Sequence, residues 1–371
     1  MKIICEKEKL ALGINIVQKA VSSKTTLPIL EGILIETNKE GIKLTSNDLE
    51  IGIECLLPAD VRETGGVVIE SKMLGEIIRR LPDTDISLYS EENGVFVIEC
   101  EGSLYRLASL NADEFPRLPE VKTQETLLIK QNTLKEMIRQ TIFSVSVDEN
   151  RPIFTGCLLN ITDGDINMVS VDGFRLSLRK QKYEGETKEF NVVIPGKTLN
   201  EIFKILQNND EEISISVAKN QALFKMKNIK IVSRILEGEF LNYKAAIPVE
   251  KETRIKVNKD ILLSAFERIY LLTREEKKYP IKLKTENNVI VIMCNSTVGN
   301  AKEEISAEID GNDIEIGFNP KYFIDALKVV EKEQIYIDLT TSMAPCVIRP
   351  IEEEEEFVYM ILPVRIREEN I

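Results

Sequence analysis

The chain has 371 residues, of which 43% are hydrophobic, so it can form packed cores in two to four domains and is not disordered as a whole. Its formal net charge of −13 excludes a nucleic-acid binder that acts through overall charge, so any such contact needs a local cationic surface. The chain contains no histidine, which excludes Ser-His-Asp and Cys-His catalytic sites and metal sites with histidine ligands.

The six cysteines are far apart in the chain and form no CxxC pair, so the sequence predicts buried, reduced thiols rather than a zinc site or a disulfide scaffold. The N-terminal residues have no apolar core of signal-peptide length, and charges interrupt every apolar run before it reaches membrane-spanning length. We therefore expect a cytoplasmic protein. The cysteines are Cys5, Cys55, Cys100, Cys157, Cys294 and Cys346.

The chain repeats with a period of about 124 residues. The segment PILEGIL at 28–34 resembles PIFTGCL at 152–158, which lies 124 positions later, and a weaker third copy begins at Pro280, 128 positions after Pro152. A helical pattern lies upstream of each copy. These patterns contain Leu10, Leu134 and Leu262, which are 124 and 128 positions apart.

The second half of each repeat contains a more regular amphipathic helix, predicted over 71–81, 196–206 and 320–330. Short alternating runs with turn signals lie between the helices and predict strands. The sequence therefore predicts an α+β protein of three tandem domains, each with two helices packed on antiparallel sheets. We place these domains at 1–121, 122–249 and 250–371, the third with a C-terminal tail.

These second helices carry cations at the same positions of their helical repeat, opposite the apolar face. Acidic residues at 76, 201 and 325 lie close to them, so ordinary solvated faces with ion pairs between neighbouring turns are the alternative interpretation. If the repeats close into a ring with the helices inward, this surface attracts phosphates without reading bases. The cations are Lys72, Lys197 and Lys321 near the helix starts, and Arg79, Lys204 and Lys328 near the ends.

Three further segments carry a resemblance to a known family: KTTLPIL at 24–30, the hairpin VSVDGFRL at 169–176 and the C-terminal MILPVRI at 360–366. Together with the repeats, they make the whole chain similar to the bacterial DNA polymerase III β subunit, the sliding clamp. The resemblance implies the DNA clamp fold, in which three domains form half of a six-domain ring. It implies a head-to-tail homodimer that encircles double-stranded DNA irrespective of sequence, with Lys24 and the six helix cations facing the DNA.

The resemblance also implies partners and the absence of chemistry. The ring tethers the replicative DNA polymerase, an ATP-driven clamp loader opens and places it, and other replication and repair proteins bind it. No catalytic residue, cofactor or metal is expected. Partner peptides enter an apolar pocket between the second and third domains. Its predicted residues are Phe154, Val171, Gly173, Phe174, Arg175, Leu176, Leu241, Ala245, Ala246, Cys346, Met360, Ile361, Leu362, Pro363, Val364 and Arg365.

The chain departs from the family pattern at several of these positions. The family usually has histidine where Phe174 stands and often proline where Leu241 stands, so this pocket is expected to be more apolar and to lack a titrating group there. Small side chains at Ala245 and Ala246 leave the pocket depth open. The charged segment 273–279 contacts either DNA or a neighbouring subunit in this interpretation, and the sequence does not choose between them.

Two other functions have some support in the residues. The run at 190–198 ends in Gly-Lys-Thr before a helix, but a phosphate-binding loop needs glycine where Asn191 stands, so nucleotide hydrolysis is not expected. The second function is a peptide-binding scaffold that keeps the pocket and does not encircle DNA. The repeated cations favour the clamp over this scaffold, because a scaffold has no need of them.

Overall fold

The computed structural model describes residues 1–22, 25–120, 125–186, 189–273, 280–297, 299–352 and 357–366. The chain divides into two compact units, Met1–Asn132 with Lys204–Ile235, and Thr133–Phe203 with Leu236–Ile371. The division passes through the middle repeat, because that repeat contributes one set of strands to each unit.

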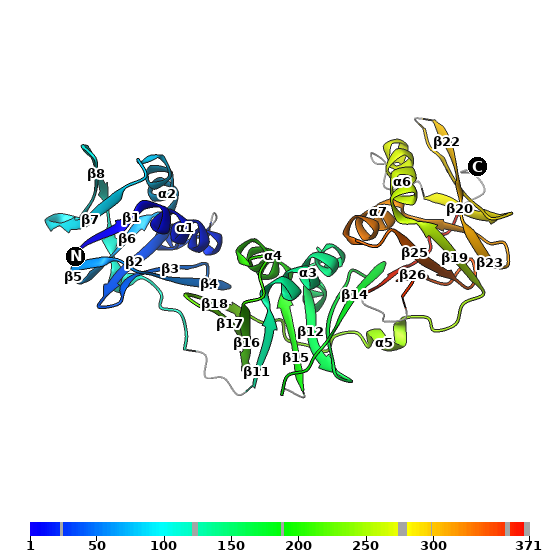
Figure 1. Cartoon of the computed structure of the whole chain (residues 1–371), viewed down its shortest axis with the longest axis horizontal. Coiled ribbons are helices and arrows are strands. Elements are labelled where there is room, and N and C mark those ends of the chain that lie inside the picture. Colours follow the sequence, from blue (N-terminus) through cyan, green and yellow to red (C-terminus); the bar gives the residue numbers. More distant parts are fainter. Residues whose placement is uncertain are drawn as a thin grey trace. The chain divides into compact units, whose positions relative to one another are not determined.

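The three repeats share a common order of main elements, which is a strand, a first helix, a run of strands, a second helix and three further strands (Figure 1). The first contains β1 Lys2–Glu6, α1 Lys7–Val17, β2 Gly32–Asn38, β3 Gly41–Asn47, β4 Ile51–Leu57, β5 Asp60–Glu63, β6 Gly65–Glu70, α2 Ser71–Arg80, β7 Asp85–Glu91, β8 Val95–Cys100, β9 Ser103–Ala108 and β10 Leu110–Asn111. The second contains β11 Glu125–Lys130, α3 Gln131–Thr141, β12 Gly156–Thr162, β13 Asp165–Val171, β14 Arg175–Lys182, β15 Phe190–Pro195, α4 Gly196–Ile205, β16 Glu212–Ala218, β17 Gln221–Met226, β18 Ile229–Arg234 and the short α5 Tyr243–Ala246. The third contains β19 Thr253–Asn258, α6 Lys259–Thr273, β20 Ile281–Glu286, β21 Val289–Asn295, β22 Asn300–Ser306, β23 Glu308–Gly311, β24 Glu315–Phe318, α7 Pro320–Val329, β25 Gln334–Leu339, β26 Cys346–Pro350 and β27 Phe357–Ile361.

Each unit contains one nine-stranded antiparallel sheet that continues from one repeat into the next. In the first unit the order is β10-β6-β2-β3-β4-β18-β17-β16-β11, and the repeats join where β4 pairs with β18. In the second unit the order is β15-β12-β13-β14-β27-β26-β25-β19-β23, and the repeats join where β14 pairs with β27. We call these the first and second junctions. Ile53 lies opposite Ile231 in the first and Ser177 opposite Tyr359 in the second, so the register repeats at offsets of 124 and 128.

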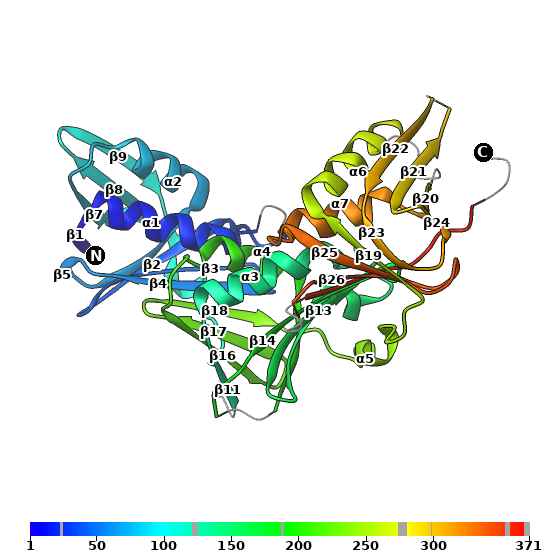
Figure 2. The same cartoon turned by 45° about the vertical axis from the view of Figure 1, so that its right-hand side comes forward.

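Each unit also contains a smaller sheet with a free edge. The first unit has a five-stranded sheet, β5-β1-β7-β8-β9, and the second has a four-stranded sheet, β22-β21-β20-β24. Figure 2 shows the latter beside α6, whose apolar face packs on it. Strands β9 and β22 are therefore each paired on one side only, in the sheets that the structure describes.

The predicted second helices are confirmed as α2, α4 and α7, each within one residue of its expected end. Helix α2 begins where the Glu70 side chain accepts hydrogen bonds from the Lys72 and Met73 amides, and it buries Leu74 and Ile78. Helix α7 begins at Pro320, whose missing amide proton is no loss in a first helical turn. Local sequence signals therefore mark where these helices begin.

The predicted alignment of Pro280 with Pro152 is wrong. Pro28 and Pro152 each begin a short 3-10 helix four residues before a strand, whereas Pro280 comes directly before β20. The hairpin turns give the true register, since Thr162 pairs with Asp165 and Glu286 with Val289, an offset of 124. The third repeat is shorter by four residues between its first helix and first hairpin.

After the last long strand of each repeat, the chain returns to the strand that precedes the second helix of the same repeat. Leu110 pairs with Val68 on β6, and the Leu236 amide donates to the Val193 carbonyl on β15 at 2.9 Å. The Val364 amide likewise donates to the carbonyl of residue 317 on β24 at 2.8 Å. Each repeat thus closes with a segment that returns to its own edge strand. No helix in the described parts of the chain has the length and apolar character needed to span a membrane.

Candidate partner pocket and cationic helix faces

Strands β12, β13, β14, β15, β26 and β27 carry an apolar cluster on the sheet face opposite the helices. On β27, Val358 and Met360 belong to this cluster, whereas Phe357, Tyr359 and Ile361 point into the helix-covered core. We call it the outer cluster. Its buried members are Leu158, Val169, Val171, Leu176, Leu178, Val193, Tyr243, Val347, Val358 and Met360.

Part of the predicted pocket is this outer cluster. Val171, Leu176 and Met360 are buried members, and Phe154 packs against them from its 3-10 helix. Two predicted residues lie elsewhere: Cys346 and the neighbouring Ile361 are buried in the core of the third domain, where no ligand on the outer face could touch their side chains. The alternation of strand side chains explains this, because Cys346 and Ile361 are paired across β26 and β27 and share the inner face.

Three large apolar side chains next to the outer cluster are exposed. Phe174 is 58% exposed, Leu241 40% and Val364 39%. Exposed aromatic and aliphatic side chains beside a buried apolar cluster are typical of a docking surface.

The β13–β14 turn holds Phe174 outward. The Asp172 carboxylate accepts hydrogen bonds from the Phe174 and Arg175 amides, and Gly173 adopts a φ of +90°, which favours glycine. The Phe174 ring stacks on Tyr322 of α7, with the ring centroids 6.4 Å apart. The Leu362 amide donates to the Phe174 carbonyl at 2.8 Å, which ties the C-terminal tail to the turn.

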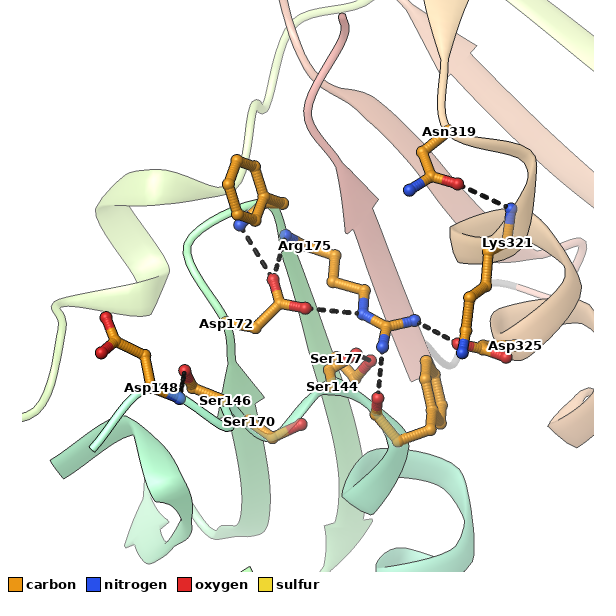
Figure 3. Close-up of polar contacts among 12 residues, drawn as sticks. Ser144, Ser146, Asp148, Ser170, Asp172, Arg175, Ser177, Asn319, Lys321 and Asp325 are labelled. Atoms are coloured by element: carbon orange, nitrogen blue, oxygen red, sulfur yellow. Dashed lines mark hydrogen bonds and ion pairs between the residues drawn. The ribbon is translucent and has the colours of Figure 1, made fainter. Parts of the chain in front are cut away.

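Arg175 is not a free cation of the pocket rim. Its guanidinium donates to Asp172 at 3.0 Å, to Asp325 of α7 at 2.7 Å and to the Phe143 carbonyl at 2.6 Å (Figure 3). It also lies 4.7 Å from the centre of the Tyr322 ring, and only 10% of its side chain is exposed. Arg175 therefore links the middle repeat to the third repeat beneath the turn, and sequence reasoning missed this role because Asp325 is 150 positions away.

The segment that carries Leu241 is held on the middle domain by two polar contacts. The Tyr243 hydroxyl donates to Asn160 at 3.5 Å, and Lys244 pairs with Asp163 at 2.6 Å. The Lys244 ammonium lowers the pKa of the Asp163 carboxyl, whereas burial raises the pKa of Tyr243. A cavity of about 370 Å³ lies between this segment and the sheet, with Leu241 in its wall. The predicted Ala245 and Ala246 lie on α5, where Ala245 is exposed and Ala246 half-buried.

The C-terminal tail crosses β24 at residue 317. A side chain on Gly317 would overlap Ile366 and the Val364 carbonyl, so glycine is required for the tail to lie this close. Leu362 and Pro363 are half-buried, and Arg365 is exposed. Arg365 is thus the only predicted pocket residue in the described chain that offers an exposed positive charge to a ligand.

The predicted cations all lie on exposed helix positions where the structure describes them. In the first unit, Lys72 and Arg79 of α2 are exposed, and Arg79 donates to the Gln18 side chain at 3.4 Å; Lys204 is exposed at the end of α4. In the second unit, Lys197 and Lys321 are exposed in first helical turns. Lys328 is exposed and pairs with Glu267 of α6 at 2.9 Å. Lys24 lies outside the described residues, as do residues 274–279 of the charged loop.

Comparisons with known proteins cover the whole chain. Family models of the DNA polymerase III beta subunit match residues 1–119 with the N-terminal domain, 128–242 with the central domain and 244–365 with the C-terminal domain. The beta sliding clamp of Halalkalibacterium halodurans is 38% identical over 98% of this chain and all of that protein. The crystal structure of the Bacillus subtilis sliding clamp is 36% identical, covers 99% of this chain and all of its own, and superposes with a TM-score of 0.95.

A sliding clamp from Pseudomonas aeruginosa, solved bound to griselimycin, is 25% identical, with a TM-score of 0.93 over 99% of this chain and all of that one. The three matched family domains correspond to the three repeats of this chain. The chain belongs to the DNA polymerase III beta subunit family, the beta sliding clamps.

Proposed function

We propose that this protein is a DNA sliding clamp that works as a ring of two copies joined head to tail in the cytoplasm. The clamp is the non-catalytic processivity factor of its polymerase, so its function is topological rather than chemical. The observation that carries the proposal is the pair of free strand edges at β9 and β22.

The repeat explains why those two edges belong together. Strand β4 pairs with β18 at the first junction, and β14 pairs with β27 at the second. Strand β22 is the equivalent of β4 and β14 in the third repeat. Strand β9 is the equivalent of β18 and β27 in the first repeat. Three repeats in one chain make only two junctions, so the third must come from a second copy. A free strand edge is otherwise a site of unwanted association, and a contact of this kind that closes gives a ring.

The repeated turns set the register of this third junction. The turn bonds Asp48 N to Ile51 O and Ser296 N to Gly299 O are equivalent, at an offset of 248. Applied to the first junction, that offset puts Ala301 in the place of Ile53. The hairpin pairs Cys100–Ser103 and Met226–Ile229 are equivalent at an offset of 126, which puts Tyr105 in the place of Ile231. Tyr105 of one copy is therefore expected opposite Ala301 of the other. Apolar side chains are exposed beside both edges: Tyr105 is 41% exposed on β9, and Leu271 is 63% exposed on α6, which packs against β22. Pairing the edges would cover them.

DNA binding rests on the exposed helix cations. Six cations occupy equivalent positions on three helices, and the rest of an acidic chain repels phosphate. We propose that Lys24, Lys72, Arg79, Lys197, Lys204, Lys321 and Lys328 face duplex DNA and contact its backbone without reading sequence.

Partner binding rests on the outer cluster and its exposed apolar side chains. We propose that peptides from the replicative polymerase, the ATP-driven clamp loader and other replication and repair proteins dock there. Phe174, Leu241 and Val364 would provide the contact area, and Arg365 the charge. Since Phe174 carries no titrating group, this binding should not change between pH 6 and 8 through that residue.

Retention on DNA distinguishes the clamp from a scaffold that binds peptides alone. The clamp would be loaded on nicked circular DNA with the cognate loader and ATP, and half of each sample would then be linearised. Retention on circles and loss from linear ends supports encirclement. Equal behaviour on both templates would contradict the ring and favour the scaffold.

A further inference from the structure

The third domain has a pocket of about 320 Å³ on the sheet face opposite its core. Ile281, Leu283, Ile290 and Ile292 point into the core, so the alternating neighbours on β20 and β21 point to the outer face. The tail closes one side through Ile366. The pocket lining includes Lys282, Met293, Asn295, Asn300, Lys302 and Ile366.

This pocket is the third-domain counterpart of the outer cluster. At the offset of 124 set by the hairpin turns, Lys282 stands where Leu158 stands in the middle domain, and Lys302 stands where Leu178 stands. Both leucines are buried in the outer cluster. The third domain thus replaces two apolar residues of the outer cluster with cations at equivalent positions.

The outer cluster of the middle domain is completed by side chains of the third domain. Leu178 lies opposite Val358 at the second junction, and Val358 is only 1% exposed because it packs into the outer cluster. At the proposed third junction the same place is taken by Leu104 of a second copy, which is 49% exposed in the single chain. Arg106 of the second copy, which pairs with Glu91 of its own chain at 3.3 Å, takes the place of Met360 and adds a third cation.

The first domain shows what this sheet face can hold. Its own segment after β10 lies there: Phe115 is buried against Leu34, Leu118 covers Gly52 so closely that no side chain would fit, and Arg117 pairs with Glu36 of β2. Asn300 is the third-domain counterpart of Gly52. The sheet face at a junction therefore accepts an extended segment with an apolar anchor and a residue of charge opposite to the face.

We propose that the third-domain pocket, completed by Leu104 and Arg106 of a second copy, binds an extended peptide segment in which acidic and apolar residues alternate. The inference rests on the proposed head-to-tail dimer. Lys282 already pairs with Glu315 at 2.9 Å and Lys302 with Glu304 at 2.6 Å. Each ammonium has three donors, so a ligand carboxylate adds a further acceptor, and the amides of Asn295 and Asn300 offer donors beside them.

The test uses the full-length protein and a fluorescein-labelled peptide of alternating glutamate and leucine, with alternating lysine and leucine as the comparison. Binding is read as fluorescence anisotropy, and sedimentation velocity reports the dimer in the same samples. We expect the acidic peptide to bind and the basic one not to bind. The double variant K282L/K302L should weaken binding about ten-fold or more while the dimer persists. R106L should also weaken it.

Lys256→Leu is the matched control, because Lys256 is another outward-facing strand lysine of the third domain, is paired with Glu308 at 3.1 Å, and does not line the pocket. Unchanged affinity in K282L/K302L, or equal binding of both peptides, would overturn the inference. A wild-type protein that sediments as a monomer would overturn it together with the dimer. A stable dimer that fails to bind the acidic peptide overturns the pocket alone.

Discussion

The guanidinium of Arg175 on β14 and the carboxylate of Asp325 on α7 lie 2.7 Å apart and join two repeats of the chain beneath the Phe174 turn. Both side chains are largely buried, at 10% and 24% exposed, and Arg175 also binds Asp172 and the Phe143 carbonyl. An arginine with this many partners orients the pocket wall rather than offering charge to a ligand.

Replacing Arg175 should therefore cost stability. R175A leaves two acidic groups and a carbonyl without their donor, and we expect it to lower the free energy of unfolding by about 3 kcal/mol. Urea unfolding followed by circular dichroism measures this. R151A is the control, since Arg151 pairs with Asp148 at 3.2 Å with its side chain 48% exposed, and should cost less than about 1 kcal/mol. Equal losses in both variants would show that Arg175 has no linking role.

The C-terminal tail should be required for partner binding. Deletion of residues 362–366 removes Val364 and Arg365 and frees the Phe174 turn from Leu362, so a polymerase-derived peptide should no longer bind while the dimer persists. G317V should weaken the same peptide because its side chain displaces the tail from β24. Isothermal titration calorimetry measures the affinity. Full-strength binding by the deletion variant would show that the pocket is misplaced.

Neutralising the helix cations should weaken DNA binding equally for all sequences. Changing Lys24, Lys72, Lys197 and Lys321 to glutamine removes four charges per copy, and the slope of log affinity against log salt should fall by about one for each phosphate that is no longer neutralised. Filter binding over a salt series measures it. K225Q, at an exposed position on β17, is the control and should change nothing. Weaker binding that is confined to some sequences argues against backbone contact.

The proposed third junction can be trapped by a disulfide. With cysteines at Tyr105 and Ala301 in one chain, mild oxidation should give a covalent dimer held by two bonds, provided that the two residues face each other across β9 and β22. Denaturing gel electrophoresis without reductant detects it. Neither single variant should cross-link. Cysteines at Tyr105 and Glu303, which is displaced by two positions along β22 from Ala301, give the register control. If that pair cross-links as well as the first, the proposed register is wrong.

The native cysteines should not interfere, because all six are buried. Burial raises the pKa of Cys55 to about 11 and of Cys157 to about 12, so few thiolates exist at pH 8. We expect almost no reaction with Ellman's reagent until guanidinium unfolds the chain. Because a raised pKa in the folded state favours the protonated form, stability should be full below about pH 9 and fall as pH rises from there toward 11. Thermal unfolding over that pH range measures it, and constant stability would contradict the burial argument.

Much of this molecule follows from local sequence. The repeats, the second helices of each domain and the Asp172–Gly173 turn were all predictable, because each depends on residues within one element or one hairpin. The exposure of Lys72 and Lys321 follows from helix periodicity in the same way. The alignment at Pro280 failed because it rests on a short motif, whereas strand register depends on pairing between segments.

The tertiary structure decided what distant residues do to one another. Only strand pairing shows that Cys346 and Ile361 face the core rather than a ligand, since a shift of one residue reverses the face of a strand. Only packing brings Asp325 to Arg175, and so removes that arginine from the free charges of the pocket. The sequence by itself determined three repeats and a family. The folded sheets decided which strand edges, grooves and charges remain accessible to partners. The reason is that a neighbouring strand satisfies the backbone hydrogen bonds of the strand it pairs with and covers its side chains.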